Sequence, residues 1–140
     1  MPAALEMMDQ LCTRAVEEYI HAGLPVDAAA ILLVEDDVLI GMMLVDMFDA
    51  LGLPEPAQAT TNEEALALIA NEPLLGALVD INLGDEKGWP IADALAARDI
   101  PFAFTSGGGD VIPAEHAGRR LVSKPFRLND IEAAIREFSA

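Results

Sequence analysis

Four groups of polar residues follow short apolar runs along the chain, and their types could support metal binding and phosphoryl transfer. The groups are Glu35-Asp36-Asp37, Asp80, Thr105-Ser106-Gly107 and Ser123-Lys124-Pro125. Carboxylates that converge repel one another unless a cation neutralises them, and hard oxygen ligands suit magnesium or manganese. A carboxylate can also act as a nucleophile towards phosphorus, with a lysine and a hydroxyl to counter the charge of the transferred group.

The order of elements predicts how these groups come together. Apolar runs predict buried strands at 31–34, 74–79, 102–105 and 121–123, with a weaker strand at 57–60. Helical spacing and capping residues predict helices at 37–51, 61–71, 88–97 and 128–138. This alternation is typical of an α/β fold with a doubly wound, parallel, five-stranded sheet. Ligands of such sheets bind beyond the carboxyl ends of the strands, so all four polar groups are expected at one edge.

Three segments need separate interpretation. The helix at 37–51 is expected to bury an apolar stripe, made of Leu39, Met43, Leu44, Met47, Phe48 and Leu51. The glycines and proline between Ser106 and Gly118 argue against a regular helix, so this stretch is expected to be loop, with the segment from 80 to 87 a second loop. Residues 3–22 predict an additional amphipathic helix, joined by a linker at 23–29, which gives an extension at 1–29 and a domain at 30–140.

Composition limits the class of protein. The chain has 140 residues, of which 53% are hydrophobic, and a formal net charge of -16. These values favour one folded domain with a short appendage, and they disfavour binding to nucleic acid or to an anionic membrane. One cysteine excludes an intramolecular disulfide. The sequence shows no basic segment leading into an apolar one and no run long enough for a spanning helix, which favours a cytoplasmic location.

Two other functions of such a sheet fit the residues less well. A flavin phosphate loop after the first strand should be rich in glycine, serine and threonine, whereas Glu35-Asp36-Asp37 would repel a phosphate. A phosphatase of the haloacid dehalogenase type would have a second aspartate two residues after Asp80, where this chain has Asn82. Both hypotheses are therefore disfavoured.

The residues from about 30 to 139 resemble the receiver domain of bacterial two-component response regulators. The matching stretches are Ile31-Leu32-Leu33-Val34-Glu35-Asp36-Asp37, Leu78-Val79-Asp80-Ile81-Asn82-Leu83 with Gly88, Phe104-Thr105-Ser106-Gly107, and Val122-Ser123-Lys124-Pro125-Phe126. The resemblance implies a flavodoxin-like fold of five strand–helix units, here with the fourth helix shortened. It also implies a protein that accepts a phosphoryl group and turns over no separate substrate, so it is not classed as an enzyme.

The resemblance assigns a role to each strand end. Asp80 would be the phosphoacceptor, and Mg²⁺, or Mn²⁺, would be held by Glu35, Asp36, Asp80 and the backbone carbonyl of Asn82. Lys124 would pair with the phosphoryl group, and the bond between Lys124 and Pro125 would be cis.

The switch hydroxyl of the family falls on either Thr105 or Ser106. The family has a proline five residues before this hydroxyl and a small residue after it, which Pro101 and Gly107 supply for Ser106. We therefore favour Ser106.

Two departures indicate a subfamily. Leu121 stands where most receivers have an aromatic residue, and the stretch between Ser106 and Lys124 is short for a full helix and strand. These features are similar to the alphaproteobacterial FAT GUY subfamily of single-domain regulators, although its tyrosine is Gly108 here. The resemblance implies a histidine kinase as partner and a setting often found in general stress responses.

The leading hypothesis is a stand-alone receiver, in which phosphorylation of Asp80 acts as a switch or a phosphate sink. The alternative is a pseudo-receiver, a protein-binding module without phosphotransfer. No output domain follows the last predicted helix, so a changed protein surface and a downstream protein partner are expected instead. Self-association through the helix at 3–22 is a further expectation, since its apolar stripe must pack on the chain's own surface or on a second copy.

Overall fold

The computed structural model describes residues 30–139. These residues form a five-stranded sheet with the order β2-β1-β3-β6-β7, in which every neighbouring pair is parallel. The strands are β1 (Ala30–Val34), β2 (Ala57–Ala59), β3 (Leu74–Asp80), β6 (Phe102–Ser106) and β7 (Leu121–Ser123). The predicted α/β class and sheet are therefore confirmed. The helix predicted at 3–22 and the division at residue 29 lie outside the described residues.

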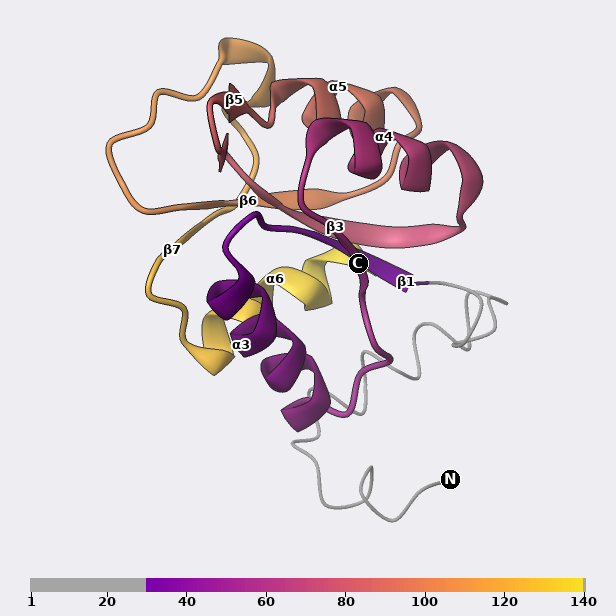
Figure 1. Ribbon diagram of the computed structural model, residues 1–140, viewed down its shortest axis with the longest axis vertical. Coiled ribbons are helices and arrows are strands. Elements are labelled where there is room, and N and C mark those ends of the chain that lie inside the picture. Colours follow the sequence, from indigo (N-terminus) through magenta and orange to yellow (C-terminus); the bar gives the residue numbers. More distant parts are fainter. Residues whose placement is uncertain (1–29, 140) are drawn as a thin grey trace.

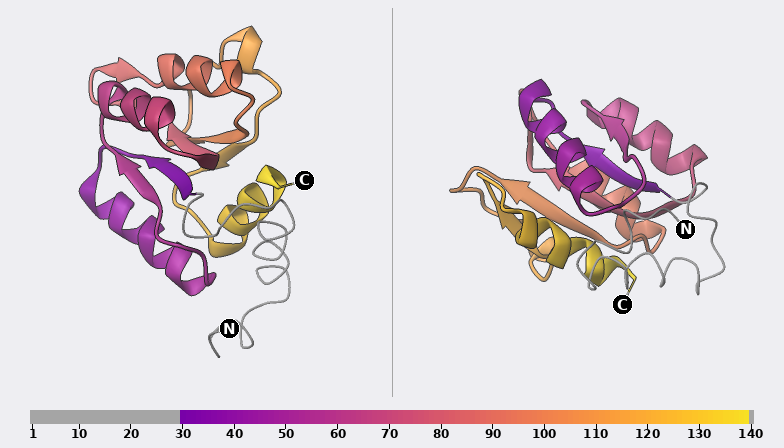
Figure 2. Two further views of the ribbon diagram at one scale, coloured as in Figure 1. Left: turned by 90° about the vertical axis from the view of Figure 1, so that its right-hand side faces the viewer. Right: turned by 90° about the horizontal axis from the view of Figure 1, so that it is seen from below.

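Two helices cover each face of the sheet (Figure 1). One pair consists of α3 (Val38–Ala50) and α6 (Leu128–Phe138), and the other of α4 (Asn62–Asn71) and α5 (Trp89–Ala97). The turned views in Figure 2 show the same three layers. The sheet is thus doubly wound, as the alternation of elements predicted.

The core divides into two halves because successive side chains of a strand point to opposite faces. In β1, Ile31 and Leu33 belong to the half under α3 and α6, whereas Leu32 and Val34 belong to the half under α4 and α5. All four side chains are buried. A central strand buried on both faces explains why its sequence is a continuous apolar run rather than an alternating one.

Polar residues fix where the helices begin. The carboxylate of Asp37 accepts hydrogen bonds from the backbone N–H groups of Leu39 and Ile40, which caps α3. The hydroxyl of Thr61 accepts one from the N–H of Glu64, and the Glu64 carboxylate accepts one from the N–H of Thr60. These bonds satisfy amide groups that a helix start leaves without internal partners.

The apolar stripe predicted for the helix at 37–51 is partly wrong. Leu44 and Phe48 are buried against the sheet, but Leu39 is 74% exposed and Met43 is 43% exposed. With Val38 and Met42, which are also exposed, they lie on the outward side of the first two turns. The first turns of α3 carry apolar residues on more sides than the sheet can cover, so the sequence pattern overstated the stripe.

The segment from 80 to 87 is also more regular than predicted. It contains a small antiparallel hairpin of β4 (Asn82–Leu83) and β5 (Glu86–Lys87), joined through Gly84 at a φ of 61°. A positive φ favours glycine, so Gly84 suits this turn. The hairpin matters for the site because it follows Asp80 directly.

The predicted shortening of the fourth helix is confirmed. Between β6 and β7 the chain forms only the short helix η1 (Ala114–His116). His116 is 3% exposed, its ring lies edge-on to Phe102 and Phe104, and its Nε2 lies 2.8 Å from Asp93 Oδ1 on α5. His116 thus anchors the connection to the rest of the fold. Within residues 30–139, no helix is both long enough and apolar enough to cross a bilayer.

Candidate functional site

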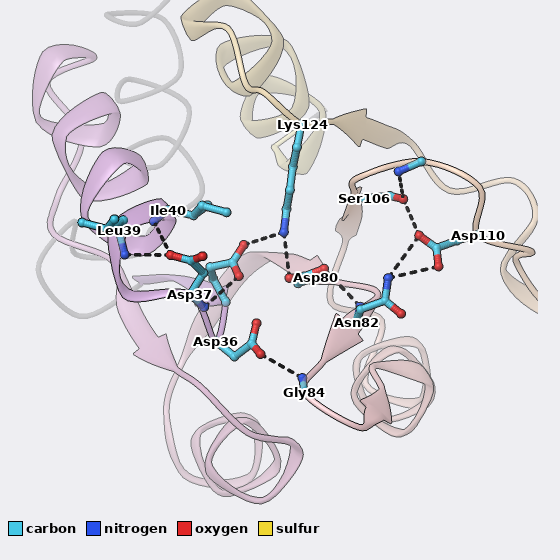
Figure 3. Close-up of polar contacts among 12 residues, drawn as sticks. Asp36, Asp37, Leu39, Ile40, Asp80, Asn82, Gly84, Ser106, Asp110 and Lys124 are labelled. Atoms are coloured by element: carbon cyan, nitrogen blue, oxygen red, sulfur yellow. Dashed lines mark hydrogen bonds and ion pairs between the residues drawn. The ribbon is translucent and has the colours of Figure 1, made fainter.

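The carboxyl edge of the sheet gathers the predicted polar groups, as Figure 3 shows. Glu35 and Asp36 directly follow β1, Asp80 and Ser106 end β3 and β6, and Lys124 follows β7. These strands are neighbours in the order β1-β3-β6-β7, so their ends lie next to one another. The sequence argument therefore selected residues that the fold does bring together.

Lys124 links two buried carboxylates. Its Nζ lies 2.9 Å from Asp80 Oδ2 and 3.0 Å from Glu35 Oε1. The side chains of Glu35 and Asp80 are only 2% and 4% exposed, while that of Lys124 is 20% exposed. An ammonium shared between two buried carboxylates compensates part of the cost of removing their charges from water. The peptide bond between Lys124 and Pro125 is cis, as the family resemblance implied.

The protonation of Glu35 reflects this environment. Its pKa is raised from 4.5 to about 7, chiefly by burial and in part by the neighbouring Asp80, while hydrogen bonds from Asp37 and Lys124 act in the opposite direction. For Lys124, burial lowers the pKa, but the hydrogen bonds to Asp80 and Glu35 outweigh burial and hold the pKa above its ordinary value. The site therefore keeps its lysine charged and leaves Glu35 close to its titration point at neutral pH.

A pH-dependent stability follows from the raised pKa of Glu35. The native state keeps a proton on Glu35 that the unfolded chain releases near pH 4.5, so the stability contributed by this proton is complete below pH 4.5 and is lost as pH rises through about 7. In a chelating buffer, we expect this loss to reach up to about 3 kcal/mol. Denaturant unfolding gives the free energy of unfolding of the wild type and of Glu35→Gln, whose side chain cannot titrate, at each pH. The difference between the two pH dependences measures the contribution of Glu35. Parallel curves for the two proteins between these pH values would contradict the assignment.

The three consecutive acids after β1 have different roles. Asp37 caps α3, and its backbone N–H donates to Glu35 Oε2 at 3.1 Å. The Asp36 carboxylate instead accepts a hydrogen bond of 2.8 Å from the backbone N–H of Gly84, in the hairpin that follows Asp80. Asp36 thus ties the end of β1 to the loop after β3. Of the three acids, Asp37 is therefore the capping residue of α3.

The donor set fits a hard divalent cation. One carboxylate oxygen from each of Glu35, Asp36 and Asp80 lies within 4.8 Å of the others. Glu35 Oε1 is buried, and beyond its contact with Lys124 it has no further hydrogen-bond donor among the described residues. Carboxylate oxygens without saturating hydrogen bonds are the ligands that magnesium uses in proteins. The chemistry of the cluster therefore agrees with the predicted metal site.

Gly88 allows the Asp80 backbone to approach the start of α5. Its N–H donates to the carbonyl of Ile81 at 2.8 Å, and a Cβ at this position would lie 2.7 Å from the carbonyl oxygen of Asp80. Real Cβ atoms do not come that close to a backbone oxygen. The glycine noted in the sequence therefore serves close packing behind Asp80.

The two candidate hydroxyls are both buried. Thr105 pairs with Asp80 in the register of β3 and β6, and Ser106 is the last residue of β6. The Ser106 hydroxyl donates to Asp110 Oδ2 at 2.5 Å, and Asn82 Nδ2 donates to the same carboxylate at 3.1 Å. Because adjacent strand residues point to opposite faces, only one of the two hydroxyls can face this network, and it is that of Ser106.

Asp110 was missed by the sequence argument. It lies in the glycine-rich loop after Ser106, and it also forms an ion pair of 3.3 Å with Lys87 Nζ. Its partner Asn82 lies 28 positions away in the sequence, so a local sequence pattern does not predict this contact. The available signal was an acid four residues after the candidate hydroxyl.

Solved structures with similar folds include bacterial regulators. The solution structure of SdrG from Sphingomonas melonis Fr1 is 37% identical, has a TM-score of 0.71, and covers 81% of this chain and 98% of that one. The PhyR response regulator REC domain of Erythrobacter litoralis is 29% identical, with a TM-score of 0.62, over 78% of this chain and 88% of that one.

Curated proteins match over smaller shares of their own length, and no family model matches the chain. Regulatory protein VirG of Agrobacterium tumefaciens (strain 15955) is 30% identical over 112 residues, which is 76% of this chain and 42% of VirG. A stretch of 37 residues is 65% identical to glycolate oxidase subunit GlcD of Escherichia coli (strain K12), covering 26% of this chain and 7% of that protein. So small a share of GlcD carries no argument for a shared activity.

The fold, the edge of carboxylates with its lysine, and the relatives lead to the same conclusion. The identity of 37% across 98% of the SdrG chain indicates membership of the same family and not only the same fold. The similarity to the PhyR REC domain and to VirG is consistent with it. The chain belongs to the family of response regulator receiver domains.

Proposed function

We propose that the chain is a phosphorylation-dependent signalling protein in which Asp80 accepts a phosphoryl group from a histidine kinase. The observation that carries this proposal is the placement of Asp80. Its carboxylate is buried at the end of β3, 2.9 Å from the ammonium of Lys124 and within the same cluster as Glu35 and Asp36. A nucleophile, a fixed cation and a set of metal ligands thus meet at one point.

The proposed reaction requires one bond to form and one to break. An oxygen of the Asp80 carboxylate attacks the phosphorus of a phosphohistidine, and the phosphorus–nitrogen bond breaks as the acyl phosphate forms. The imidazole leaves with the bonding pair and takes up a proton. Lys124, held by Asp80 and Glu35, is placed to pair with the negative charge of the transferred group.

A divalent cation would be held by Glu35, Asp36, Asp80 and the backbone carbonyl of Asn82. When bound, Mg²⁺ or Mn²⁺ neutralises charge on the phosphoryl oxygens during transfer. Hydrogen bonds from the backbone already hold two of these carboxylates in position. Asp36 is held by Gly84, and the N–H of Asn82 donates to Asp80 Oδ1 at 3.1 Å.

Phosphotransfer from a kinase tests the proposal directly. A histidine kinase labelled with radioactive ATP is mixed with the chain, and label on the chain is followed with and without a chelator. Transfer that depends on divalent cation supports the proposed function. Binding to the kinase without transfer would indicate the alternative, a protein-binding module that has kept the acidic site.

The metal site provides a prediction with a neighbouring control. Asp36→Asn should weaken Mg²⁺ binding by about tenfold or more, because it removes one charged ligand. Asp37→Asn removes the same charge one residue away but keeps a good capping side chain, so it should leave binding close to that of the wild type.

The readout for both variants is the fluorescence of Trp89. It is the one tryptophan of the chain, and its ring lies 5.5 Å from that of Phe104, two residues before Ser106. Titration with Mg²⁺ gives the affinity of each protein. Equal weakening in the two variants would show that only the overall charge matters, and would contradict Asp36 as a ligand.

A further inference from the structure

The carboxylate of Asp110 lies at the centre of a polar network beside the site. It accepts hydrogen bonds from Ser106 Oγ at 2.5 Å and from Asn82 Nδ2 at 3.1 Å (Figure 3). It also pairs with Lys87 Nζ at 3.3 Å. Its side chain is only 9% exposed. Lys87 also donates to the side-chain oxygen of Asn82. Three different segments therefore meet at Asp110.

The hydroxyl proton of Ser106 is already used in a hydrogen bond within this network. A serine hydroxyl carries one proton, and in this structure that proton is directed at Asp110 Oδ2. The Ser106 oxygen in turn accepts a hydrogen bond of 2.9 Å from the N–H of Gly108. Ser106 can donate to a phosphoryl oxygen on Asp80 only if its bond to Asp110 is broken.

Asn82 connects Asp110 to the phosphoacceptor. Its backbone N–H donates to Asp80 Oδ1, while its side-chain amide donates to Asp110. The bonds from Ser106 and Asn82 hold the pKa of Asp110 below its ordinary value, so this carboxylate is charged at neutral pH. A phosphoryl group on Asp80 would place further negative charge next to the same asparagine. That repulsion favours the departure of Asp110 from the network.

We propose that Asp110 is a positioning residue, which holds the Ser106 hydroxyl in the unphosphorylated protein and releases it when Asp80 is phosphorylated. This inference rests on the proposed function of Asp80, and it names how that site is regulated. The hydrogen bond from Ser106 to Asp110 competes with the hydrogen bond from Ser106 to a phosphoryl group on Asp80. Asp110 therefore lowers the stability of the phosphorylated state in which Ser106 contacts the phosphoryl group. Release would also break the ion pair of Asp110 with Lys87 and loosen the loop between β6 and η1.

The first test needs no phosphoryl group. In Asp110→Ala, the Ser106 hydroxyl loses its acceptor, and the N–H of Gly108 should lose the fixed oxygen to which it donates. We expect hydrogen exchange at Gly108 to become about tenfold faster, as measured by NMR. Asp110→Asn keeps an oxygen acceptor and should retain most of the protection. Unchanged exchange at Gly108 in Asp110→Ala would overturn the proposal.

The second test measures whether Asp110 acts through Ser106. Beryllofluoride is the probe, since the similar protein SdrG has a solved BeF₃-activated conformation. Asp110→Ala should bind beryllofluoride with Mg²⁺ about tenfold more tightly than the wild type, because Ser106 is already free. In the background Ser106→Ala, which cannot donate, the same substitution should have a much smaller effect. Asp85→Ala, which removes an exposed acid of the neighbouring hairpin, controls for charge alone.

The outcomes separate the two proposals. Equal effects of Asp110→Ala with and without Ser106 would show that Asp110 acts through its charge, and would overturn its role as a positioning residue. A wild type that binds no beryllofluoride and takes no label would contradict the proposed function of Asp80. Exchange at Gly108 would still report whether Asp110 holds Ser106.

Discussion

Asp80→Asn should abolish formation of the acyl phosphate and leave the fold intact. An amide is not a nucleophile towards phosphorus under these conditions, so no other chemistry replaces the lost carboxylate. The asparagine oxygen can keep the hydrogen bond from the N–H of Asn82 and a contact with Lys124, which preserves the local structure. Label that is released by hydroxylamine should fall by more than about 100-fold relative to the wild type.

The same substitution should change the titration of Glu35. Asp80 raises the pKa of Glu35, and it also shares the ammonium of Lys124. Without the charge of Asp80, Lys124 pairs with Glu35 alone, and the pKa of Glu35 should fall below about 7. NMR of the Glu35 carboxyl measures this shift. Asp85→Asn, in the exposed turn of the hairpin, should alter neither labelling nor this pKa. Hydroxylamine-labile label that persists in Asp80→Asn would show that another carboxylate is the acceptor.

The fold could be predicted where local pattern and tertiary environment agree. The strands β1, β3 and β6 are continuous apolar runs because they are buried on both faces, and this pattern was recognised. The start of the helix predicted at 61–71 was found because capping is a local interaction, and the structure has Thr61 as the cap. Predicting Leu39 as buried failed because helical spacing identifies apolar positions without showing how much of the helix the sheet covers.

The residues of the site also fall into those that could be predicted from the sequence and those that could not. Residues directly after strands could be placed, because the topology of a parallel sheet fixes where strand ends lie. Asp110 and His116 could not, since neither of these two residues directly follows a strand, and their partners Asn82 and Asp93 lie 28 and 23 positions away in the sequence. Whether the hydroxyl of Ser106 donates to Asp110 depends on the path of a glycine-rich loop, and local sequence does not determine that path.

Lys124→Met should strongly destabilise the protein when no divalent cation is present. The substitution removes the ammonium that lies within 3.0 Å of both Glu35 and Asp80, and it leaves two buried carboxylates without a cation. Breaking a buried ion pair by removing one partner costs about 3–5 kcal/mol. Glu35 can relieve part of this cost by taking up a proton, because its pKa is already raised. The free energy of unfolding should therefore decrease more at pH 8 than at pH 6 in urea titrations with a chelator.

Two additions should restore the stability of Lys124→Met if this explanation holds. Mg²⁺ would bring a cation back to the same carboxylates, and a second substitution, Asp80→Asn, would remove one of the two charges. Arg120→Met breaks a pair of exposed side chains, Arg120 and Glu137, that lie 2.6 Å apart, so it should cost less than about 1 kcal/mol and respond to neither addition. A Lys124→Met protein as stable as Arg120→Met at pH 8 would mean that the buried carboxylates do not need the lysine. Its stabilising role would then be wrong, and a role for Lys124 in phosphoryl transfer would have to rest on labelling alone.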